Sequence, residues 1–479
     1  MSMLTNDPRP SSDVRRRVTA CSPLPLSPSP PLPLTASAAR VLALLLLLMP
    51  LGCSHRYPID PEHCRVLEEL SLTPQEIAAF NDGSSQDRSL GEISVQSFQD
   101  SYFSVFRRHE EALDTSRWVW HAFDAGTVLR ENLQPAQADW FDLMDSEAAW
   151  EQAGNLDKPG ISLVTTPLRA MPTEQPLVTD PRQPGQGFQF DHLQNSLINA
   201  NEPLWLSHRS RSGEWVFVLT SYASGWLRNR DVASIPEALT VSWPQMQPVA
   251  FIEEGYPVRD HRGNFLFTSR IGMVLPLIQG DKGINDVLLA TAKSPEGEAL
   301  FEAITLPSRL TVPIPMAPTY PNLATVASSL LGLPYGWGGL FENRDCSAAV
   351  RDFFMPFGLW LPRNSREQAV AGRVIKLSNL GEDQKAQLIL EEAVPFVTLL
   401  QKKGHIALYV GHYDGHPVVL HSVWDLTVKT SKGETRKHFG RIVLSPLRPS
   451  SDDGPCGPGT TLLADLDSMN ILLPPISVP

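Results

Sequence analysis

Cysteine and basic residues are scarce in this 479-residue chain, and only one long hydrophobic run is present. Five cysteines are too few for a disulfide scaffold. Lys and Arg number 40 against 52 Asp and Glu, and the resulting net charge of −12 argues against nucleic acid or an anionic lipid surface as a partner. The histidines lack the spacing of a zinc site, so we expect no metal and no other cofactor. What is left is a globular chain long enough for about three domains.

The single hydrophobic run, residues 41–49, follows Arg40. It is too short to cross a bilayer and has the length of a signal-peptide core. Leu51-Gly52-Cys53 follows and resembles the end of a bacterial lipoprotein signal, in which the cysteine is lipidated after cleavage, although Pro50 departs from that pattern. We therefore expect residues 1–53 to be an export leader. A lipid on Cys53 would be the only contact with a membrane.

The segment around Cys346 has the features of a nucleophile at a helix start. Apolar residues at Cys346, Val350 and Phe353 fit one helical stripe, and Asp345 is a plausible N-cap. A thiol attacks carbonyl groups as the thiolate, and a helix N-terminus or a neighbouring imidazole lowers its pKa. Taken alone, a cysteine beside an apolar helix is more often a small buried hydrophobe than a nucleophile.

Two histidines lie where they can serve this thiol. His405 opens a predicted strand and His421 closes the next, on either side of the turn residues 413–415. A three-residue loop over 413–415 would place both histidines on one face of the sheet. A two-residue turn would place them on opposite faces, so a catalytic role for both requires the odd-length loop.

Five segments occur in the order and rough spacing of the NlpC/p60 cell-wall peptidases, which residues 313–450 therefore resemble. They are Tyr335-Gly336-Trp337-Gly338-Gly339, Asp345-Cys346-Ser347, Leu361-Pro362-Arg363-Asn364-Ser365 with Gln368, Gly404-His405-Ile406, and His421. The family is papain-like and cleaves peptidoglycan stem peptides, typically between γ-D-glutamate and a diamino acid. One departure is Ala348, where the family usually has glycine; alanine is the better helix former.

The resemblance implies roles for the matching residues. Cys346 would be the nucleophile, His405 the base and His421 the residue that orients the base. The Tyr335 hydroxyl and the backbone N–H of Cys346 would form an oxyanion hole, because donors fixed in advance at the developing charge stabilise the transition state.

The remaining chain divides into regions of different composition. Residues 54–155 are predicted to be a mainly helical region, similar to a stabilising segment found in some multidomain relatives. Short β-rich runs and turn residues in 156–236 and 237–312 indicate two SH3-like β-barrels. The acidic, Gly- and Pro-containing residues 451–479 are predicted to be a flexible tail. The fold class is therefore multidomain α+β, with a papain-like catalytic domain after the two barrels.

In relatives with this layout, the first SH3-like domain walls the active site and restricts it to short peptides with a free amino end. Carried over by motif, Asp345, Ser347 and Ser365 would bind the ammonium of an N-terminal L-alanine. Arg169 is a candidate for a substrate carboxylate, since guanidinium binds carboxylate bidentately. Tyr222 is a candidate for the same wall.

The predicted function is a cysteine endopeptidase for the γ-D-glutamyl–diamino acid bond. Its substrates would be peptidoglycan stem peptides or muropeptides in the bacterial envelope or periplasm. Recycling of released muropeptides and remodelling of the intact wall both remain open. One alternative is a cysteine amidase or acyltransferase acting on another amide, and a second is a non-catalytic cell-wall-binding protein. The intact set of candidate catalytic residues argues against the second alternative.

Overall fold

The computed structural model describes residues 77, 93–107, 118–183, 185–413, 415–430, 433–447 and 462–472, and the side chains of 427–437 are not among them. The predicted leader 1–53, with Cys53, lies outside these ranges. No helix within them is long and apolar enough to span a membrane. The described residues belong to a single compact unit.

Short helices make up the described part of the N-terminal region, as its sequence predicted. They are α3 (Val95–Tyr102), η3 (Ser104–Phe106), η4 (Trp118–His121), α5 (Ala138–Ala148) and η5 (Trp150–Gln152). Helix α5 buries Trp140 and Met144 against a small apolar cluster that includes Met171 and Leu177. These aromatic and apolar residues therefore form a core that joins the N-terminal helices to the β region after them.

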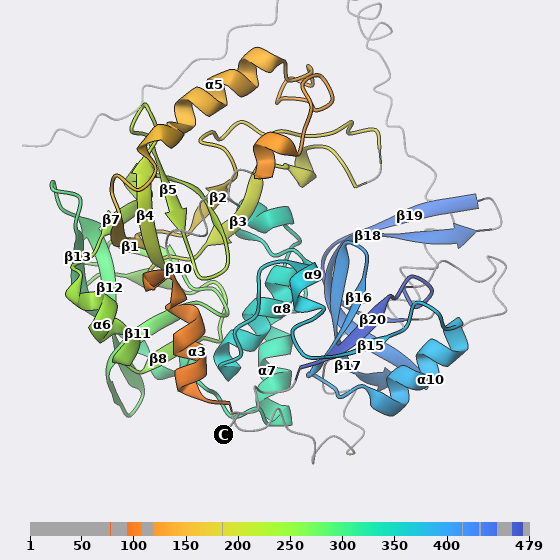
Figure 1. The fold of residues 1–479 in the computed structure, drawn as a ribbon. Helices are drawn as coiled ribbons and strands as arrows, with labels where there is room; N and C mark the ends of the chain where they lie inside the picture. Colours follow the sequence, from red (N-terminus) through yellow and green to blue (C-terminus); the bar gives the residue numbers. More distant parts are fainter. Residues whose placement is uncertain are drawn as a thin grey trace, which may run out of the picture. The chain divides into compact units, whose positions relative to one another are not determined.

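The first β domain is a strongly curved seven-stranded sheet of order β3-β2-β6-β5-β4-β1-β7 (Figure 1). Its strands are β1 (Lys158–Ser162), β2 (Thr166–Arg169), β3 (Gln194–Ile198), β4 (Pro203–Arg209), β5 (Trp215–Leu219), β6 (Ser224–Arg228) and β7 (Val232–Ser234). Leu168, Leu204, Val216 and Val218 are buried in one cluster, so the domain has a core of its own. Short helical turns η6 (Phe188–Phe190) and η7 (Asn229–Asp231) interrupt the strands.

The second β domain has a five-stranded sheet of order β13-β12-β11-β8-β14 and a separate β9-β10 hairpin. Its strands are β8 (Pro248–Phe251), β9 (Pro257–Arg259), β10 (Phe265–Thr268), β11 (Val274–Asp281), β12 (Ile284–Lys293), β13 (Ala299–Pro307) and β14 (Thr311–Pro313); its helical turns are α6 (Ala238–Ser242), η8 (Trp243–Gln245) and η9 (Ser308–Leu310). Phe251, Leu275, Val287 and Leu306 form a second, distinct core.

The third domain is a six-stranded sheet of order β15-β20-β16-β17-β18-β19, with helices on both faces. Its strands are β15 (Arg373–Lys376), β16 (Thr398–Lys402), β17 (His405–Tyr413), β18 (His416–Thr430), β19 (Gly433–Pro446) and β20 (Ser468–Ile471). Its helices are α7 (Tyr320–Leu330), η10 (Trp337–Glu342), α8 (Cys346–Phe354), η11 (Met355–Phe357), α9 (Ser365–Gln368) and α10 (Glu382–Glu392).

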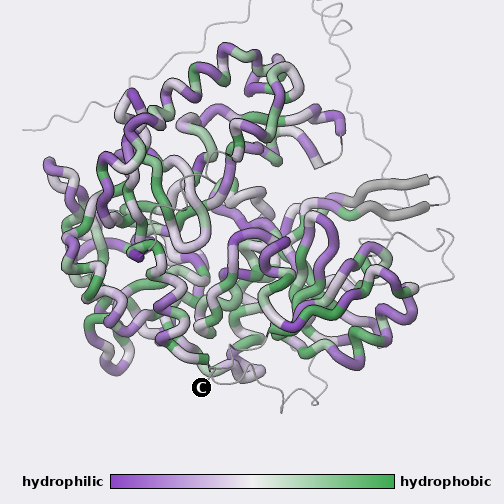
Figure 2. Tube along the Cα trace, viewed as in Figure 1, coloured by the Kyte–Doolittle hydropathy of each residue, from purple (hydrophilic) through white to green (hydrophobic). Residues whose placement is uncertain are grey.

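Alternation along the strands explains this layering. In β17, Ile406, Leu408 and Val410 pack with α7 and α8, whereas Ala407 and Tyr409 pack on the α10 side. Figure 2 shows hydrophobic residues concentrated along these central strands and polar residues in the peripheral loops. The sheet is therefore buried on both faces, and α8 lies against β17 and β18.

The predicted flexible tail is wrong for residues 462–472. Strand β20 lies between β15 and β16, where it pairs Asn470 with both Val374 and Leu399. Leu463, Met469 and Ile471 are buried in the core. The apolar residues at the end of this segment therefore complete the catalytic sheet, although the acidic, Gly- and Pro-rich residues before them suggested a tail.

Candidate active site

Cys346 is the first residue of α8, as the sequence predicted. Asp345 is the N-cap, with an extended backbone, and its Oδ1 accepts a hydrogen bond from the N–H of Ala348 at 2.8 Å. The apolar stripe of the helix is buried, and it includes Val350, Phe353 and Phe354. The N–H of Cys346 lies in the first turn, where a backbone donor has no intrahelical partner. The local sequence thus presents the thiol at a positive helix end.

The two histidines share one face of the sheet by a different route from the predicted one. Tyr413 pairs with His416, so the connection is a two-residue turn and not the three-residue loop. A β-bulge between Tyr409 and Gly411 then shifts the register, and Leu408 lies opposite Leu420. This is the register that the odd-length loop would have produced. The bulge supplies the extra residue, and the statement that the loop itself must be odd was wrong.

A chain of hydrogen bonds runs behind the thiol. His405 Nε2 lies 2.8 Å from His421 Nδ1, and His421 Nε2 lies 3.0 Å from Ser445 Oγ. His421 and Ser445 are buried, with 1% and 3% of their surface exposed. This bond engages Nε2 of His405, so Nδ1 is the ring nitrogen that does not contact His421. His405 and His421, the predicted base and orienting residue, are thus hydrogen-bonded to each other, and Ser445 extends the chain.

The surroundings of the Cys346 thiol and of the His405 imidazole both favour the uncharged form. Burial, and then the negative charge of Asp345, raise the pKa of Cys346 to about 12, although the backbone N–H groups of Ile406 and Ser347 oppose this. Burial and the charge of Lys402 lower the pKa of His405 to about 4. The predicted lowering of the thiol pKa by the helix N-terminus is thus outweighed. If Cys346 acts as a nucleophile, the thiol proton has to be transferred as the attack proceeds.

Arg363 is a residue that the sequence interpretation left without a role. Its guanidinium contacts Asp345 through Nη2–Oδ2 (2.6 Å) and Nη1–Oδ1 (3.2 Å), and it donates to the hydroxyls of Ser347 (2.9 Å) and Ser196 (2.9 Å). Burial by itself raises the pKa of Asp345, but the charge and hydrogen bonds of Arg363 outweigh it and hold that pKa below its usual value. Ser196 belongs to β3, so this network joins the nucleophile helix to the first β domain.

Asp345 is saturated with donors. Besides Arg363 and Ala348, it accepts from the N–H of Gly338 at 3.0 Å and from the Ser347 hydroxyl at 3.1 Å. Two carboxylate oxygens offer about four lone-pair sites, all of which are occupied here. The predicted contact of Asp345 with a substrate ammonium is therefore not supported by this geometry. The carboxylate caps α8 and holds Arg363.

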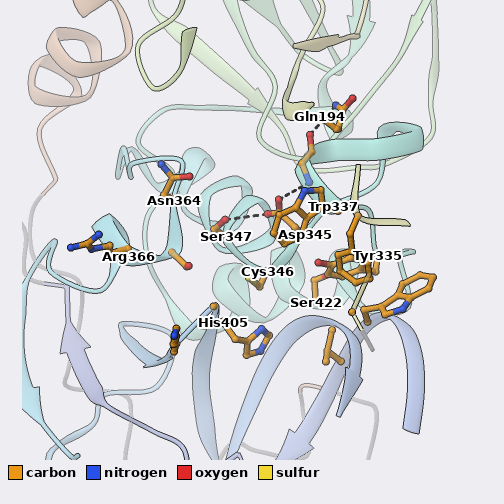
Figure 3. Close-up of a pocket in the computed structure, with 18 of the residues that line it drawn as sticks. Gln194, Tyr335, Trp337, Asp345, Cys346, Ser347, Asn364, Arg366, His405 and Ser422 are labelled. Carbon is orange, nitrogen blue, oxygen red and sulfur yellow. Dashed lines mark hydrogen bonds between the residues drawn. The ribbon is translucent and has the colours of Figure 1, made fainter. Parts of the chain in front are cut away.

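A pocket of about 810 Å³ contains the thiol and most of the predicted site. Its walls include Tyr335, Asp345, Cys346, Ser347, Ser365 and His405 from the third domain, and Phe190, His192, Gln194 and Asn195 from the first β domain. Figure 3 shows Cys346 above His405, with Tyr335 and Trp337 to one side and Asn364 and Arg366 to the other. The first β domain therefore walls the active site, as predicted. The volume suits a ligand of several hundred daltons.

Close backbone packing brings that wall to the site. Gly338 and Gly339 have φ of +58° and +88°, and a Cβ on Gly338 would lie 2.1 Å from the carbonyl oxygen of Gln194. Gln194 in turn donates to the carbonyl of Gly338 at 3.0 Å. These glycines therefore hold β3 against the loop that carries Tyr335. Burial raises the pKa of the Tyr335 hydroxyl, which remains a proton donor.

Arg169 and Tyr222 do not line the pocket. Arg169 is buried and bonded to Asp191 at 2.7 Å, and it also donates to Gln194 Oε1 at 3.0 Å. Tyr222 lies against the guanidinium of Arg351, 3.6 Å from the ring centre, and donates to the carbonyl of Leu197. Both side chains are engaged inside the protein, so the geometry does not support the substrate contacts predicted for them.

Comparison with family models agrees with this architecture. Residues 176–228 match the SH3 domain of SH3b1 type, residues 243–282 match the SH3 domain of SH3b2 type, and residues 332–439 match the NlpC/P60 family. The chain contains an NlpC/P60 domain preceded by two SH3 domains. The predicted multidomain α+β fold class is thereby confirmed.

Individual relatives match over parts of their length. A probable endopeptidase of Corynebacterium glutamicum (strain R) is 26% identical over 149 residues, 31% of this chain and 64% of that protein. The γ-D-glutamyl-L-lysine dipeptidyl-peptidase of Bacillus subtilis (strain 168) is 34% identical over 97 residues, 19% of this chain and 30% of that protein. The chain thus spans less than two thirds of the length of these relatives.

Among solved structures, an NlpC/P60 endopeptidase from Photobacterium damselae subsp. piscicida is similar over most of its length. It superposes with a TM-score of 0.71 at 21% identity, and the match covers 84% of this chain and 98% of that one. At this identity the likeness establishes a shared fold that includes the SH3 domains as well as the NlpC/P60 domain.

Proposed function

We propose that this protein is a cysteine endopeptidase that hydrolyses the γ-D-glutamyl–diamino acid bond of peptidoglycan stem peptides. The observation that carries the proposal is the thiol of Cys346, which shares one pocket with His405 while His405 is bonded to the buried His421. The NlpC/P60 domain and the two SH3 domains support a cell-wall substrate. The similarity to a γ-D-glutamyl-L-lysine dipeptidyl-peptidase supports this choice of bond.

In the acylation step, the sulfur of Cys346 attacks the γ-carbonyl carbon of the D-glutamyl residue while Nδ1 of His405 takes the thiol proton. The negative charge that develops on the carbonyl oxygen is stabilised by the Tyr335 hydroxyl and the backbone N–H of Cys346. His405 then passes the proton to the nitrogen of the diamino acid, and the C–N bond breaks. A thioester and a free amine result.

In the second step, water replaces the amine. His405 takes a proton from the water as it attacks the thioester carbonyl, and the C–S bond breaks. The proton returns to the sulfur, which restores the neutral pair. Throughout both steps, His421 holds the ring of His405 in one tautomer, because Nε2 of His405 donates to Nδ1 of His421.

A free N-terminal L-alanine on the substrate is the finer part of this proposal. Asp345 is neutralised by Arg363, so recognition of the ammonium falls to the hydroxyl of Ser365 and to the one lone pair of Ser347 that Arg363 does not occupy; both side chains line the pocket. Neutral hydroxyls bind an ammonium less strongly than an unpaired carboxylate does. We therefore expect N-acetylation of the peptide to lower kcat/KM by roughly tenfold, without abolishing cleavage.

The test is mass spectrometry of L-Ala-γ-D-Glu-diaminopimelate incubated with the mature protein. Release of free diaminopimelate by the wild type, and none by Cys346→Ala, is the expected result. The N-acetylated peptide, run in parallel, reports the free-amine requirement. Cleavage at another amide would point to an amidase, and intact peptide with retained binding to cell-wall sacculi would point to a binding protein; either outcome contradicts the proposal.

We also propose export to the cell envelope, with Cys53 as the lipid attachment site. The sequence before Cys53 supports this, and the SH3 domains suit a protein that acts on the wall. Mass analysis of the N-terminal peptide of the protein from its own cells should give a diacylglyceryl-modified Cys53. An unmodified N-terminus at another residue would contradict the lipid anchor.

A further inference from the structure

The pocket around Cys346 is more basic than the chain as a whole. Its lining contains four permanently basic side chains and two carboxylates: Arg363, Arg366, Lys402 and Lys403, against Asp345 and Asp425. The complete chain carries a net charge of −12. The electrostatic potential in the pocket is therefore positive, although the protein as a whole carries a negative charge.

Two of these four cations are already compensated. Arg363 is paired with Asp345 at 2.6 Å, and Lys402 is paired with Asp465 at 3.0 Å. Arg366 and Lys403 are exposed, and neither forms an ion pair or a side-chain hydrogen bond within the described ranges. Their charges are therefore available to a ligand in the pocket.

Both residues stand on fixed backbone next to catalytic groups. Arg366 lies in α9, directly after Ser365, and Gln368 of the same helix is fully buried and donates to the carbonyls of Ser347 (3.0 Å) and Pro362 (2.8 Å). Lys403 lies in the turn between β16 and β17, two residues before His405. The position of Arg366 is thus fixed by a helix that is hydrogen-bonded to α8, which carries Cys346, and Lys403 lies directly before β17, which carries His405.

The opposite end of the pocket has a different character. Phe190 lies 5.5 Å from Trp337 and 5.9 Å from Trp424, measured between ring centres, and Tyr335 lies 5.7 Å from Trp424. Figure 3 places Tyr335 and Trp337 across Cys346 from Arg366. A substrate that spans Cys346 therefore meets aromatic rings on one side and the uncompensated Arg366 on the other, and Lys403 lines the same pocket.

We propose that Arg366 and Lys403 form a carboxylate-binding subsite that selects acidic peptides next to the scissile bond. The inference rests on the proposed function, because a γ-linked glutamyl residue keeps its α-carboxylate free close to the reacting carbonyl. The diamino acid supplies a second carboxylate on the leaving side when it ends the peptide. Guanidinium and ammonium groups bind carboxylates by charge-assisted hydrogen bonds.

The test measures binding separately from cleavage. Isothermal titration calorimetry would use the full-length Cys346→Ala protein and three peptides: L-Ala-γ-D-Glu-diaminopimelate, its D-glutamyl α-amide, and its amide at the diaminopimelate end. Arg366→Gln and Lys403→Gln would be added to Cys346→Ala, with Lys282→Gln as the matched control, since Lys282 is an exposed cation on the second SH3 domain. Circular dichroism would verify that each variant is folded.

We expect one of the two amidations to weaken binding by roughly tenfold, and we expect that preference to vanish in Arg366→Gln or Lys403→Gln but not in Lys282→Gln. The amidation that matters identifies which carboxylate binds. Equal affinity for all three peptides, or a preference that survives both substitutions, would overturn the subsite. Failure of the wild type to cleave a peptide that Cys346→Ala binds with this preference would overturn the proposed function and leave the subsite standing.

Discussion

Two hydrogen-bonded networks meet at Cys346, and they differ in charge. One is an ionic network of Asp345, Arg363 and Ser196, in which the carboxylate has all its acceptor sites occupied. It extends into the first SH3 domain. The other is a neutral chain of His405, His421 and Ser445 that stays within one sheet. All of these residues are buried except His405, which is half-buried where it lines the pocket.

The difference shows how the fold separates support from chemistry. A buried ion pair is expensive to break, because the charge left behind has no water to solvate it. The ion pair is therefore suited to holding helix α8 in a fixed position. A neutral imidazole can accept the thiol proton, and the imidazolium that forms is compensated by the negative charge that develops on the substrate oxygen. It therefore suits the proton transfers of the proposed reaction.

Removal of the base should have the largest effect on rate. We expect His405→Ala to lower kcat by about a thousandfold, because the thiol, whose pKa is raised to about 12, would have no proton acceptor. Peptide cleavage followed by mass spectrometry measures the change. His412→Ala, on an exposed part of the same strand, is the control and should retain nearly full rate. A loss below about tenfold in His405→Ala would mean that another group takes the proton.

Loss of the ionic network should have the largest effect on stability. We expect Arg363→Leu to lower the free energy of unfolding by about 3–5 kcal/mol, since it leaves the Asp345 carboxylate buried without a countercharge. Urea unfolding measures the change. The double variant Arg363→Leu with Asp345→Asn removes the stranded charge and keeps a capping residue, so it should recover most of the loss. Equal losses in the single and double variants would contradict the ionic role of the network.

The pH dependence of kcat/KM should differ from that of an enzyme whose base is a solvent-exposed histidine. Because burial lowers the pKa of His405 to about 4, the base stays unprotonated well below its usual range. We expect kcat/KM to hold its neutral-pH value down to about pH 5 and to fall only below that. A fall centred near pH 6.5 would show that His405 titrates as an exposed imidazole does.

The free energy of unfolding should also depend on pH through His405. The sign of this dependence is opposite to that of a histidine in a salt bridge. The folded state holds His405 neutral down to about pH 4, whereas the unfolded chain takes up that proton near the ordinary value of 6.5. Between these two values the unfolded state binds more protons, so stability decreases as the pH falls. Thermal unfolding of Cys346→Ala across this window should show the decrease, and adding His405→Ala should reduce it.

Substitution of Ser445, at the end of the neutral chain, should have the smallest effect on the rate of cleavage. We expect Ser445→Ala to lower kcat/KM by about threefold, since it removes one neutral hydrogen bond from His421. Ser445→Thr keeps the hydroxyl and should restore most of the rate. If Ser445→Ala and Ser445→Thr are equally impaired, the hydroxyl has a packing role and does not position His421.

Much of this site could be predicted from residues that lie close together in the sequence. The N-cap at Asp345 and the start of α8 follow from local helix rules. His405 and His421 were correctly placed on one face, but the route was wrong, because a bulge within β17 leaves no mark as clear as the Asp-Gly turn. Local patterns identify the elements here better than they identify the register between them.

The parts that could not be predicted depend on distant segments. Arg363 was visible within a motif, yet its bond to Ser196 needs the first SH3 domain in place. Ser445 belongs to no motif and gains its role only through pairing of β19 with β18. The guanidinium of Arg169 could bind a substrate carboxylate bidentately. Only the structure shows that it is already paired with Asp191. In each case burial and partners, not residue type, decide the role.

The position of β20 has a consequence for biosynthesis. This strand fills the place between β15 and β16, while all residues of the two networks lie upstream of it in the chain. A ribosome will therefore have made Cys346, His405 and both SH3 domains before this sheet can close. The six-stranded sheet therefore remains incomplete until Ser468–Ile471 has been synthesised and inserted.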